Sequence, residues 1–400
     1  MRTRDVDEEE KSFGLEPLPG SFIPKDGSLV ATTLKGLAED WAWHTVYDQF
    51  YLAKLPVRYK EVLLYYLSRY NPHSLDKTGL DLLLLDETEL EDGTGADGLL
   101  RLDLSTSIRN PLRLGELKEF FTARKSIATT KEEKDKAVID SWDTPEPVAT
   151  LSALPRFHNL THLSLSQPSG VSIWRGLLDL APHLTTLTHL ALAYWPTPSL
   201  SPNSNTAYRE TPQGNVNYGS SHFYSAHDND WSEAARLLRK LGKSTYCLQW
   251  LDLTGCYPWV QALASEHIDW CGAWHSLATI KIGQGWVPEC FQEGADDSTW
   301  RDWHREARLL LPTPRSTALK EWADIEHDTL QIHDRVNARI MRAIREAQSR
   351  DMSSQPQQIE ADWSDGPSEG SKPAWRSTRL VFERGWDAWW IREAIEQLVK

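Results

Sequence analysis

Two histidines and two cysteines in the second half of the chain have residue types that can bind a metal ion. His267, Cys271 and His275 follow one another at intervals of four residues, which would place them on one face of a helix, and Cys256 lies upstream. Two thiolates and two imidazoles are a ligand set for tetrahedral Zn²⁺. However, the paired Cys and His spacings of zinc modules are missing, and Gly272 weakens the assumption of a helix. We therefore predict no metal site and no cofactor, with ordinary buried cysteines and surface histidines at these positions.

A second polar cluster has the residue types used in general acid–base catalysis: His222, His227, Asp228 and Asp230. Such chemistry would require one of these groups to lie in a cleft where its pKa is shifted. The alternative is structural, because Asp230 is suited to cap a following helix, with Glu233 at the capping-box position. The chain contains no Gly-x-Ser-x-Gly elbow, P-loop or Gly-x-Gly-x-x-Gly sequence. The sequence therefore favours a protein that is not an enzyme.

The elements that hold these residues are indicated by a pattern, Leu-x-x-Leu-x-Leu, that occurs five times. The copies begin at Leu99, Leu160, Leu187, Leu248 and Leu277, and the last has Ile in place of two of the leucines. Two of the spacings are 27 and 29 residues, close to the period of about 20–29 residues in leucine-rich repeats. The other two spacings are 61 residues, so we expect an expanded or degenerate repeat there. The alternative is a set of unrelated amphipathic strands in an ordinary α/β domain.

This pattern predicts an α/β fold, an irregular leucine-rich-repeat solenoid with a helical N-terminal cap and a long C-terminal helix. The residues on either side of each central leucine are expected to point outward, because side chains alternate along a strand. His162, His189 and Trp250 each directly precede a central leucine, so they should form a ladder across neighbouring strands. The candidate binding residues on this strand face are His162, Ser164, His189, Ala191, Trp250, Asp252, Thr279 and Lys281.

Composition limits the function classes further. The formal net charge of −14 argues against a general nucleic-acid-binding protein, which would have a basic face. The first ten residues turn acidic and contain no apolar signal-peptide region, and no apolar run approaches the roughly 18 residues of a membrane span. The four cysteines include no Cys-x-x-Cys pair. We therefore expect reduced thiols in a soluble protein of the cytoplasm or nucleus, without a membrane span.

Apolar periodicity, prolines and charge runs divide the chain into six predicted segments. The long helix among them has an apolar stripe and basic later turns, which suits either packing along the array or binding a partner. The segments are an extended lead-in (1–30), a helical N-terminal cap (31–75), the repeat array (76–295) with a charged loop (129–147) and a polar loop (196–220), the long amphipathic helix region (296–350), a flexible linker (351–373) and a Trp-rich strand–helix element (374–400).

Several aromatic strings resemble those of a group of leucine-rich-repeat-like filamentous-fungal proteins. The strings are Ala42–Tyr51, Leu190–Pro198, Tyr246–Cys256 and Val381–Trp390, and the resemblance covers most of the chain from about Thr33. Members of this group are often labelled tafazzin, the name of a mitochondrial phospholipid–lysophospholipid transacylase. That label implies a His-x-x-x-x-Asp motif whose carboxylate orients the histidine to deprotonate a hydroxyl. None of the 13 histidines has Asp at this distance; His44 comes nearest, with Asp48 one residue too close.

These observations predict a non-catalytic scaffold or adaptor that binds an unidentified protein partner, and no nucleic acid, through the strand face. One alternative is an F-box-type substrate receptor of a ubiquitin ligase. Leu55-Pro56 followed by Val62, Leu63 and Leu67 resembles an F-box, a helical motif that often precedes leucine-rich repeats. The other alternative is a lipid acyltransferase, which the absence of the His-x-x-x-x-Asp motif disfavours.

Overall fold

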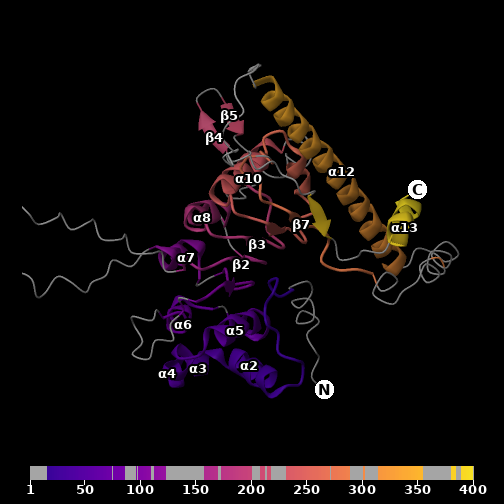
Figure 1. Ribbon diagram of the computed structural model, residues 1–400. Helices are drawn as coiled ribbons and strands as arrows, with labels where there is room; N and C mark the ends of the chain where they lie inside the picture. Colours follow the sequence, from indigo (N-terminus) through magenta and orange to yellow (C-terminus); the bar gives the residue numbers. More distant parts are fainter. Residues whose placement is uncertain are drawn as a thin grey trace, which may run out of the picture.

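The structure of the chain is a computed structural model in which helices accompany one parallel sheet, so the predicted α/β class is confirmed. Figure 1 shows a group of helices near the N-terminus, a central sheet, and a long helix at the opposite end of the molecule. The structure describes residues 16–73, 75–85, 96, 98–109, 112–122, 157–169, 173–200, 208–211, 214–217, 231–270, 272–288, 301, 314–354, 380–383 and 389–399. Among the described helices, none is both long enough and apolar enough to cross a bilayer.

In the described N-terminal part, five helices follow one another: α2 (Leu29–Glu39), α3 (Trp41–Tyr47), α4 (Gln49–Ala53), α5 (Val57–Tyr70) and α6 (Lys77–Leu83). The Ser28 side chain caps α2 by accepting a hydrogen bond from the Ala31 N–H. Helix α5 packs on α2 and on the first strand of the sheet. Its Glu61 carboxylate accepts the N–H groups of Leu100 and Arg101, both at 2.9 Å. Helix α5 therefore supplies acceptors to an edge that would otherwise expose unpaired N–H groups.

Each Leu-x-x-Leu-x-Leu copy contributes one strand to the six-stranded sheet. The strands are β1 (Arg101–Asp103), β2 (His162–Ser164), β3 (His189–Ala191), β6 (Trp250–Asp252), β7 (Thr279–Lys281) and β8 (Val381–Glu383), in that spatial order. All neighbours are parallel, and the register aligns the central residue of every strand. The sixth strand, β8, comes from the C-terminal element and extends the sheet beyond β7. Part of the expected polar loop forms a separate antiparallel hairpin of β4 (Tyr208–Thr211) and β5 (Gly214–Asn217), which pairs its own backbone groups.

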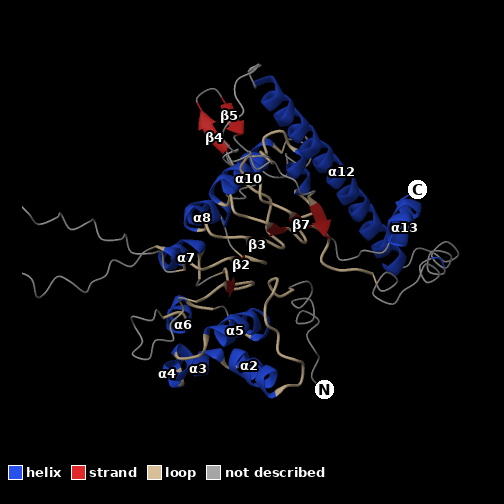
Figure 2. Cartoon of the chain, viewed as in Figure 1, coloured by secondary structure: helices blue, strands red, loops and turns tan. Residues whose placement is uncertain are grey.

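The leucines of the repeated pattern form the core on one side of the sheet. Leu102, Leu163, Leu190 and Leu251 are fully buried. Between the strands the chain forms α7 (Leu114–Phe121), α8 (Ile173–Leu180), η2 (Ala181–His183), α10 (Ser232–Ser244) and η3 (Val260–Ala264). Their apolar residues join the same core cluster, and Figure 2 shows α7, α8 and α10 stacked along one side. The opposite face of the strands is therefore left free of helices from this layer.

Helix α12 (Pro314–Ser354) runs along the end of the sheet and contacts η3 and α13 (Trp389–Val399). Its later apolar residues Val336 and Ile340 join the main core, while Trp322 packs with Ile391 in a smaller cluster. The helix begins at a proline, which tolerates the first helical turn, and continues four residues beyond the predicted boundary at Arg350.

Candidate binding face

The eight candidate residues lie on one face of the sheet, the face opposite the leucine core. We call it the strand face. The parallel register arranges its side chains in two rows, one on each side of the central residues. The first row is Arg101, His162, His189, Trp250, Thr279 and Val381; the second is Asp103, Ser164, Ala191, Asp252, Lys281 and Glu383.

In the first row, three aromatic rings lie next to one another. The His162 and His189 rings are stacked, with centroids 4.0 Å apart and an interplanar angle of 10°, and the Trp250 ring lies 5.9 Å from His189. The hydroxyl oxygens of Thr161 and Thr188 lie 2.8 Å from Nδ1 of the following histidine. Burial lowers the pKa of His162 to about 4, helped by His189 and Arg101, and burial also lowers the pKa of His189. Both rings are therefore neutral at neutral pH and stack without charge repulsion.

The second row contains two buried carboxylates in the same local arrangement. Asp103 and Asp252 each use Oδ1 to accept the backbone N–H and the hydroxyl of the residue two positions on, Ser105 and Thr254. Burial raises the pKa of Asp103 to about 6 and also raises that of Asp252, where Lys281 opposes the shift. Ser164, Ala191 and Asp252 lie on the strand face, as the sequence predicts. All three are nevertheless buried, because other parts of the chain cover them there.

One reason for this burial is a segment near the N-terminus that lies against the strand face. We call residues 16–24 the N-terminal strap. Leu18 is only 4% exposed, and the carboxylate of Glu16 lies 2.5 Å from Nζ of Lys281 on β7. The carbonyl of Pro19 accepts a hydrogen bond from Nε of Arg101 on β1, at 3.1 Å. Because these contacts reach opposite parts of the sheet, the strap runs across the strands.

The strap leaves a pocket of about 340 Å³ against the sheet. Small side chains in and just after β3, Ala191 and Ala193, leave room between the strap and the strands, and the rest of the lining includes charged side chains. The residues lining it are Glu16, Pro17, Leu18 and Pro19 of the strap, with Ser166, Ala191, Ala193, Trp250, Asp252, Lys281 and Glu383. The sequence does not predict this arrangement, because the composition of residues 1–30 indicates only an extended lead-in. The available signal was Leu18 between two prolines, an apolar residue in a stiff extended segment.

The other predicted chemical sites are not assembled. The thiol of Cys256 is buried and donates to the carbonyls of Leu192 (3.3 Å) and Trp195 (3.7 Å), and burial raises its pKa. His267 and His275 are exposed, and Cys271 lies outside the described residues. Within the described ranges no group of three His, Cys, Asp or Glu side chains is arranged to hold a metal ion. The second polar cluster, His222, His227, Asp228 and Asp230, also lies outside the described residues.

The histidine nearest to the acyltransferase motif does pair with its aspartate. Nδ1 of His44 lies 2.7 Å from Oδ2 of Asp48, one helical turn later. The i,i+4 spacing of a helix is sufficient to explain the pair. The F-box-like residues Val62, Leu63 and Leu67 are buried in the N-terminal core. Exposed apolar side chains of this region lie instead on α2, α3 and α4, among them Leu29, Trp43, Val46, Tyr47, Phe50 and Tyr51.

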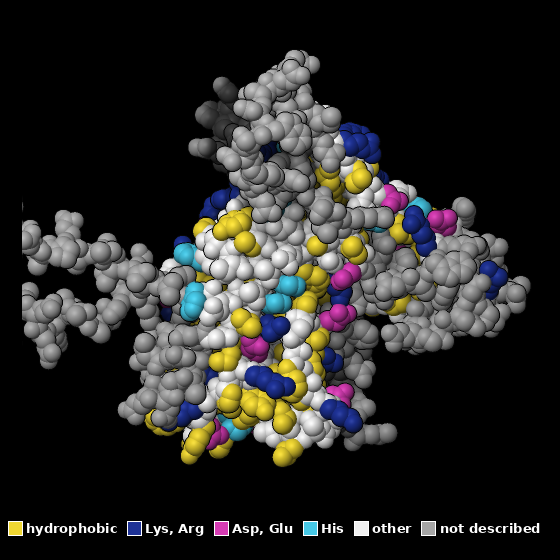
Figure 3. Space-filling model, viewed as in Figure 1, with side chains coloured by type: hydrophobic (Ala, Val, Ile, Leu, Met, Phe, Trp, Pro, Cys, Tyr) yellow, Lys and Arg dark blue, Asp and Glu magenta, His cyan; other side chains and the backbone are white. Residues whose placement is uncertain are grey.

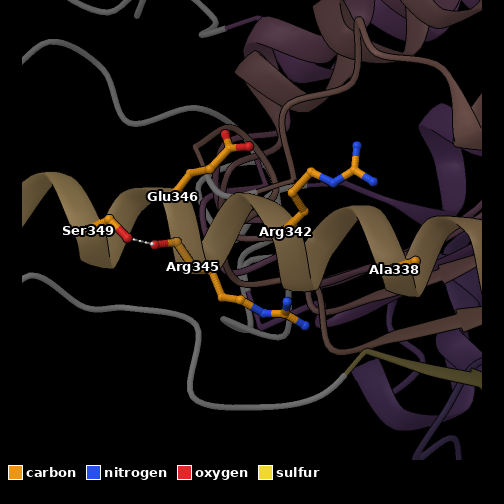
Figure 4. A pocket seen from close by; sticks show the side chains of 5 residues that line it. All are labelled: Ala338, Arg342, Arg345, Glu346 and Ser349. Atoms are coloured by element: carbon orange, nitrogen blue, oxygen red, sulfur yellow. Dashed lines mark hydrogen bonds between the residues drawn. The ribbon is translucent and has the colours of Figure 1, made fainter.

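A larger pocket, of about 510 Å³, lies along α12, but its described lining comes from one helix. Figure 4 shows the five lining side chains and places Arg342 and Arg345 on opposite sides of that helix. Because these charges diverge, the described residues do not form a site for an anion. In Figure 3 basic and acidic side chains are interspersed over the described surface, without a broad basic area on the visible face. Comparison with protein-family models, curated proteins and solved structures gives no match.

Proposed function

We propose that this chain is a non-catalytic scaffold or adaptor that binds a protein partner through the strand face, and that the array is an irregular leucine-rich-repeat solenoid. The solenoid is supported by five equivalent strands in register, each with a buried leucine or isoleucine at its centre and a second one directly after the strand. Parallel strands of a repeat array create an extended surface on which side chains from successive repeats act together.

The observation that carries the proposal is that the strand face already holds an extended polypeptide segment, the N-terminal strap. The strap is held by a buried leucine, an ion pair to Lys281 and a hydrogen bond from Arg101. These are the kinds of contact by which a surface binds a partner peptide. The same surface therefore has the chemistry to bind a segment of another protein.

The titratable groups of the face support binding more than catalysis. Oδ1 of Asp252 accepts two hydrogen bonds from its own turn, and a hydroxyl also contacts each neutral histidine. On this face these groups stabilise the local backbone and the ring stack.

The test is partner capture with the tagged protein from cells that express it. The double variant His162→Glu/His189→Glu places charges in the centre of the face, whereas the matched control His267→Glu/His275→Glu makes the same change at exposed positions. We expect a stoichiometric partner that the control retains and the face variant loses, with unchanged circular dichroism. A partner that both variants retain would contradict the proposal.

A further inference from the structure

We propose that the N-terminal strap mimics the partner, so that the strand face takes an extended acidic, proline-containing segment of the type Glu-Pro-Leu-Pro-Gly, which must displace the strap to bind. This proposal rests on the proposed protein-binding function and adds the chemistry of the ligand. Three contacts define that chemistry: a carboxylate, a buried leucine and a turn.

The carboxylate position is set by Lys281, whose side chain is 14% exposed and pairs with Glu16. Its neighbours in the second row, Asp252 and Glu383, are engaged in other bonds. Asp252 accepts from the Thr254 N–H and hydroxyl, and Glu383 accepts from Nε1 of Trp250 at 3.4 Å. The ammonium of Lys281 pairs with the acidic residue of the segment that covers it, and this attraction outweighs the repulsion between Glu16 and the nearby Asp252.

The leucine position follows from the small side chains of the neighbouring strands. Leu18 lines the same pocket as Ala191, Ala193 and Ser166. Small side chains there leave depth for a branched apolar side chain, and burying one removes most of its surface from water. A charged side chain at the position of Leu18 would lose its hydration without a partner, so the pocket selects against it.

The segment then turns at Pro19-Gly20. The Ser21 N–H donates to the Leu18 carbonyl at 3.0 Å, and Gly20 has φ +69°. Proline followed by a residue with positive φ is the signature of a type II turn. A Cβ on Gly20 would lie 2.7 Å from Nη2 of Arg101, the end of a flexible side chain that can shift, so the positive φ is what favours glycine at this position. Arg101 donates to the Pro19 carbonyl at this turn. This contact holds the backbone of the bound segment and does not depend on its side chains.

The contacts of the strap are few enough for displacement. In the described part of the chain, the backbone N–H groups of Glu16 and Leu18 make no hydrogen bond to a strand. Glu16 is 71% exposed, so solvent screens its ion pair with Lys281. The strap is also held by the Arg58 guanidinium, which lies 3.5 Å from the centroid of the Phe22 ring, and by the buried Pro24. Ordering each residue costs about 1–2 kcal/mol of backbone entropy, which offsets the gain from these few contacts. A partner segment with additional contacts beside the ladder of His162, His189 and Trp250 would therefore replace the strap.

The experiment uses a fluorescent peptide of residues 16–24 and the full chain, with binding followed by anisotropy. In the variant Leu18→Asp the strap loses its apolar anchor, and we expect the peptide to bind at least about tenfold more tightly than to the unsubstituted chain. A peptide that carries the same Leu18→Asp change should not bind. If Leu18→Asp does not fold, Leu18→Ser, a smaller polar change that also removes the apolar anchor, replaces it in the assay.

A charge exchange tests the contact itself. Adding Lys281→Glu to the opened chain should weaken binding of the native peptide about tenfold or more, and a peptide with Glu16→Lys should recover it. The control Lys240→Glu reverses an exposed lysine on α10 and should change neither peptide.

The outcomes separate the two proposals. If a folded, opened chain does not bind the peptide, or the exchanged charges give no recovery, the ligand mimic is overturned. Loss of the partner in His162→Glu/His189→Glu would then still support the scaffold function. If that variant retains its partner, the scaffold function fails whatever the peptide does. Binding together with recovery by the exchanged charges supports the ligand mimic.

Discussion

Asp103 in β1 and Asp252 in β6 belong to two copies of the same local sequence, Leu-Asp-Leu followed by Ser or Thr, yet they have different neighbours. Each carboxylate accepts an N–H and a hydroxyl from the residue two positions later. Beside Asp103 the hydroxyls of Ser105 and Ser164 lie 2.6 Å apart, whereas beside Asp252 lies Lys281, which holds Glu16 of the strap. The repeated sequence therefore forms the same turn twice. The adjacent strand determines whether the aspartate only stabilises this turn or also lies beside a residue that binds the strap.

The largest expected effects come from the leucine that precedes each aspartate. Leu102 and Leu251 are both fully buried, so truncation to alanine in either strand should lower the free energy of unfolding by about 3 kcal/mol. Thermal and urea denaturation of the two single variants should give similar losses. A large difference between them would break the comparison, because the two copies would then differ in the core as well as on the strand face.

The next largest effect is the pH dependence of stability that arises from the ionisation of each aspartate. The pKa of Asp103 is raised to about 6, so the folded state binds this proton more tightly than the unfolded chain does. The free energy of unfolding must then fall as pH rises from about 4 to 6. Asp103→Asn removes that dependence and should add roughly 2 kcal/mol of stability at pH 7 and little at pH 4.

Asp252→Asn should gain less at pH 7, because Lys281 stabilises the charged form of Asp252. Denaturation curves of the two Asn variants at pH 4 and pH 7 measure this difference. Equal gains at pH 7 would show that Lys281 does not distinguish the two positions.

A smaller effect of opposite sign is expected from the histidine pair. The pKa of His162 is lowered to about 4, so the unfolded chain binds this proton first as the pH falls below about 6.5. The contribution of His162 therefore makes the protein less stable as pH falls from about 6.5 to 4. His162→Gln should remove this slope and gain roughly 1 kcal/mol at pH 5 relative to its effect at pH 7. A Tm difference between the two proteins that is constant over this range would contradict the neutral stack.

The smallest effect on global stability is expected at the strap. Leu18→Ala should lower the free energy of unfolding by no more than about 1 kcal/mol, since the strap adds few contacts to the fold. It should nevertheless speed hydrogen exchange at the Ser21 N–H, which bonds to the Leu18 carbonyl. The control is Leu100→Ala, which shortens an exposed leucine next to β1 and should leave that exchange unchanged.

The sequence by itself determined the strands and the alignment of their central residues. Alternating leucines can bury only one face of a strand, so each Leu-x-x-Leu-x-Leu copy implied a strand whose other side chains share the opposite face. That reasoning placed His162, His189 and Trp250 in one row, which the register contains. It also assigned a strand and helix to the C-terminal element, although not the pairing of β8 with β7.

Only the tertiary structure decided what covers the strand face. The strap contacts Lys281 across 265 positions in the sequence and Arg101 across 82. No periodicity records such contacts, because one apolar residue between prolines has no repeating pattern. The burial of Asp252 and the pairing of Lys281 depend on this distant segment, since the pKa and exposure of a side chain follow from everything that surrounds it in space. Local sequence thus sets which side chains share a face, and the fold sets which of them remain available to a partner.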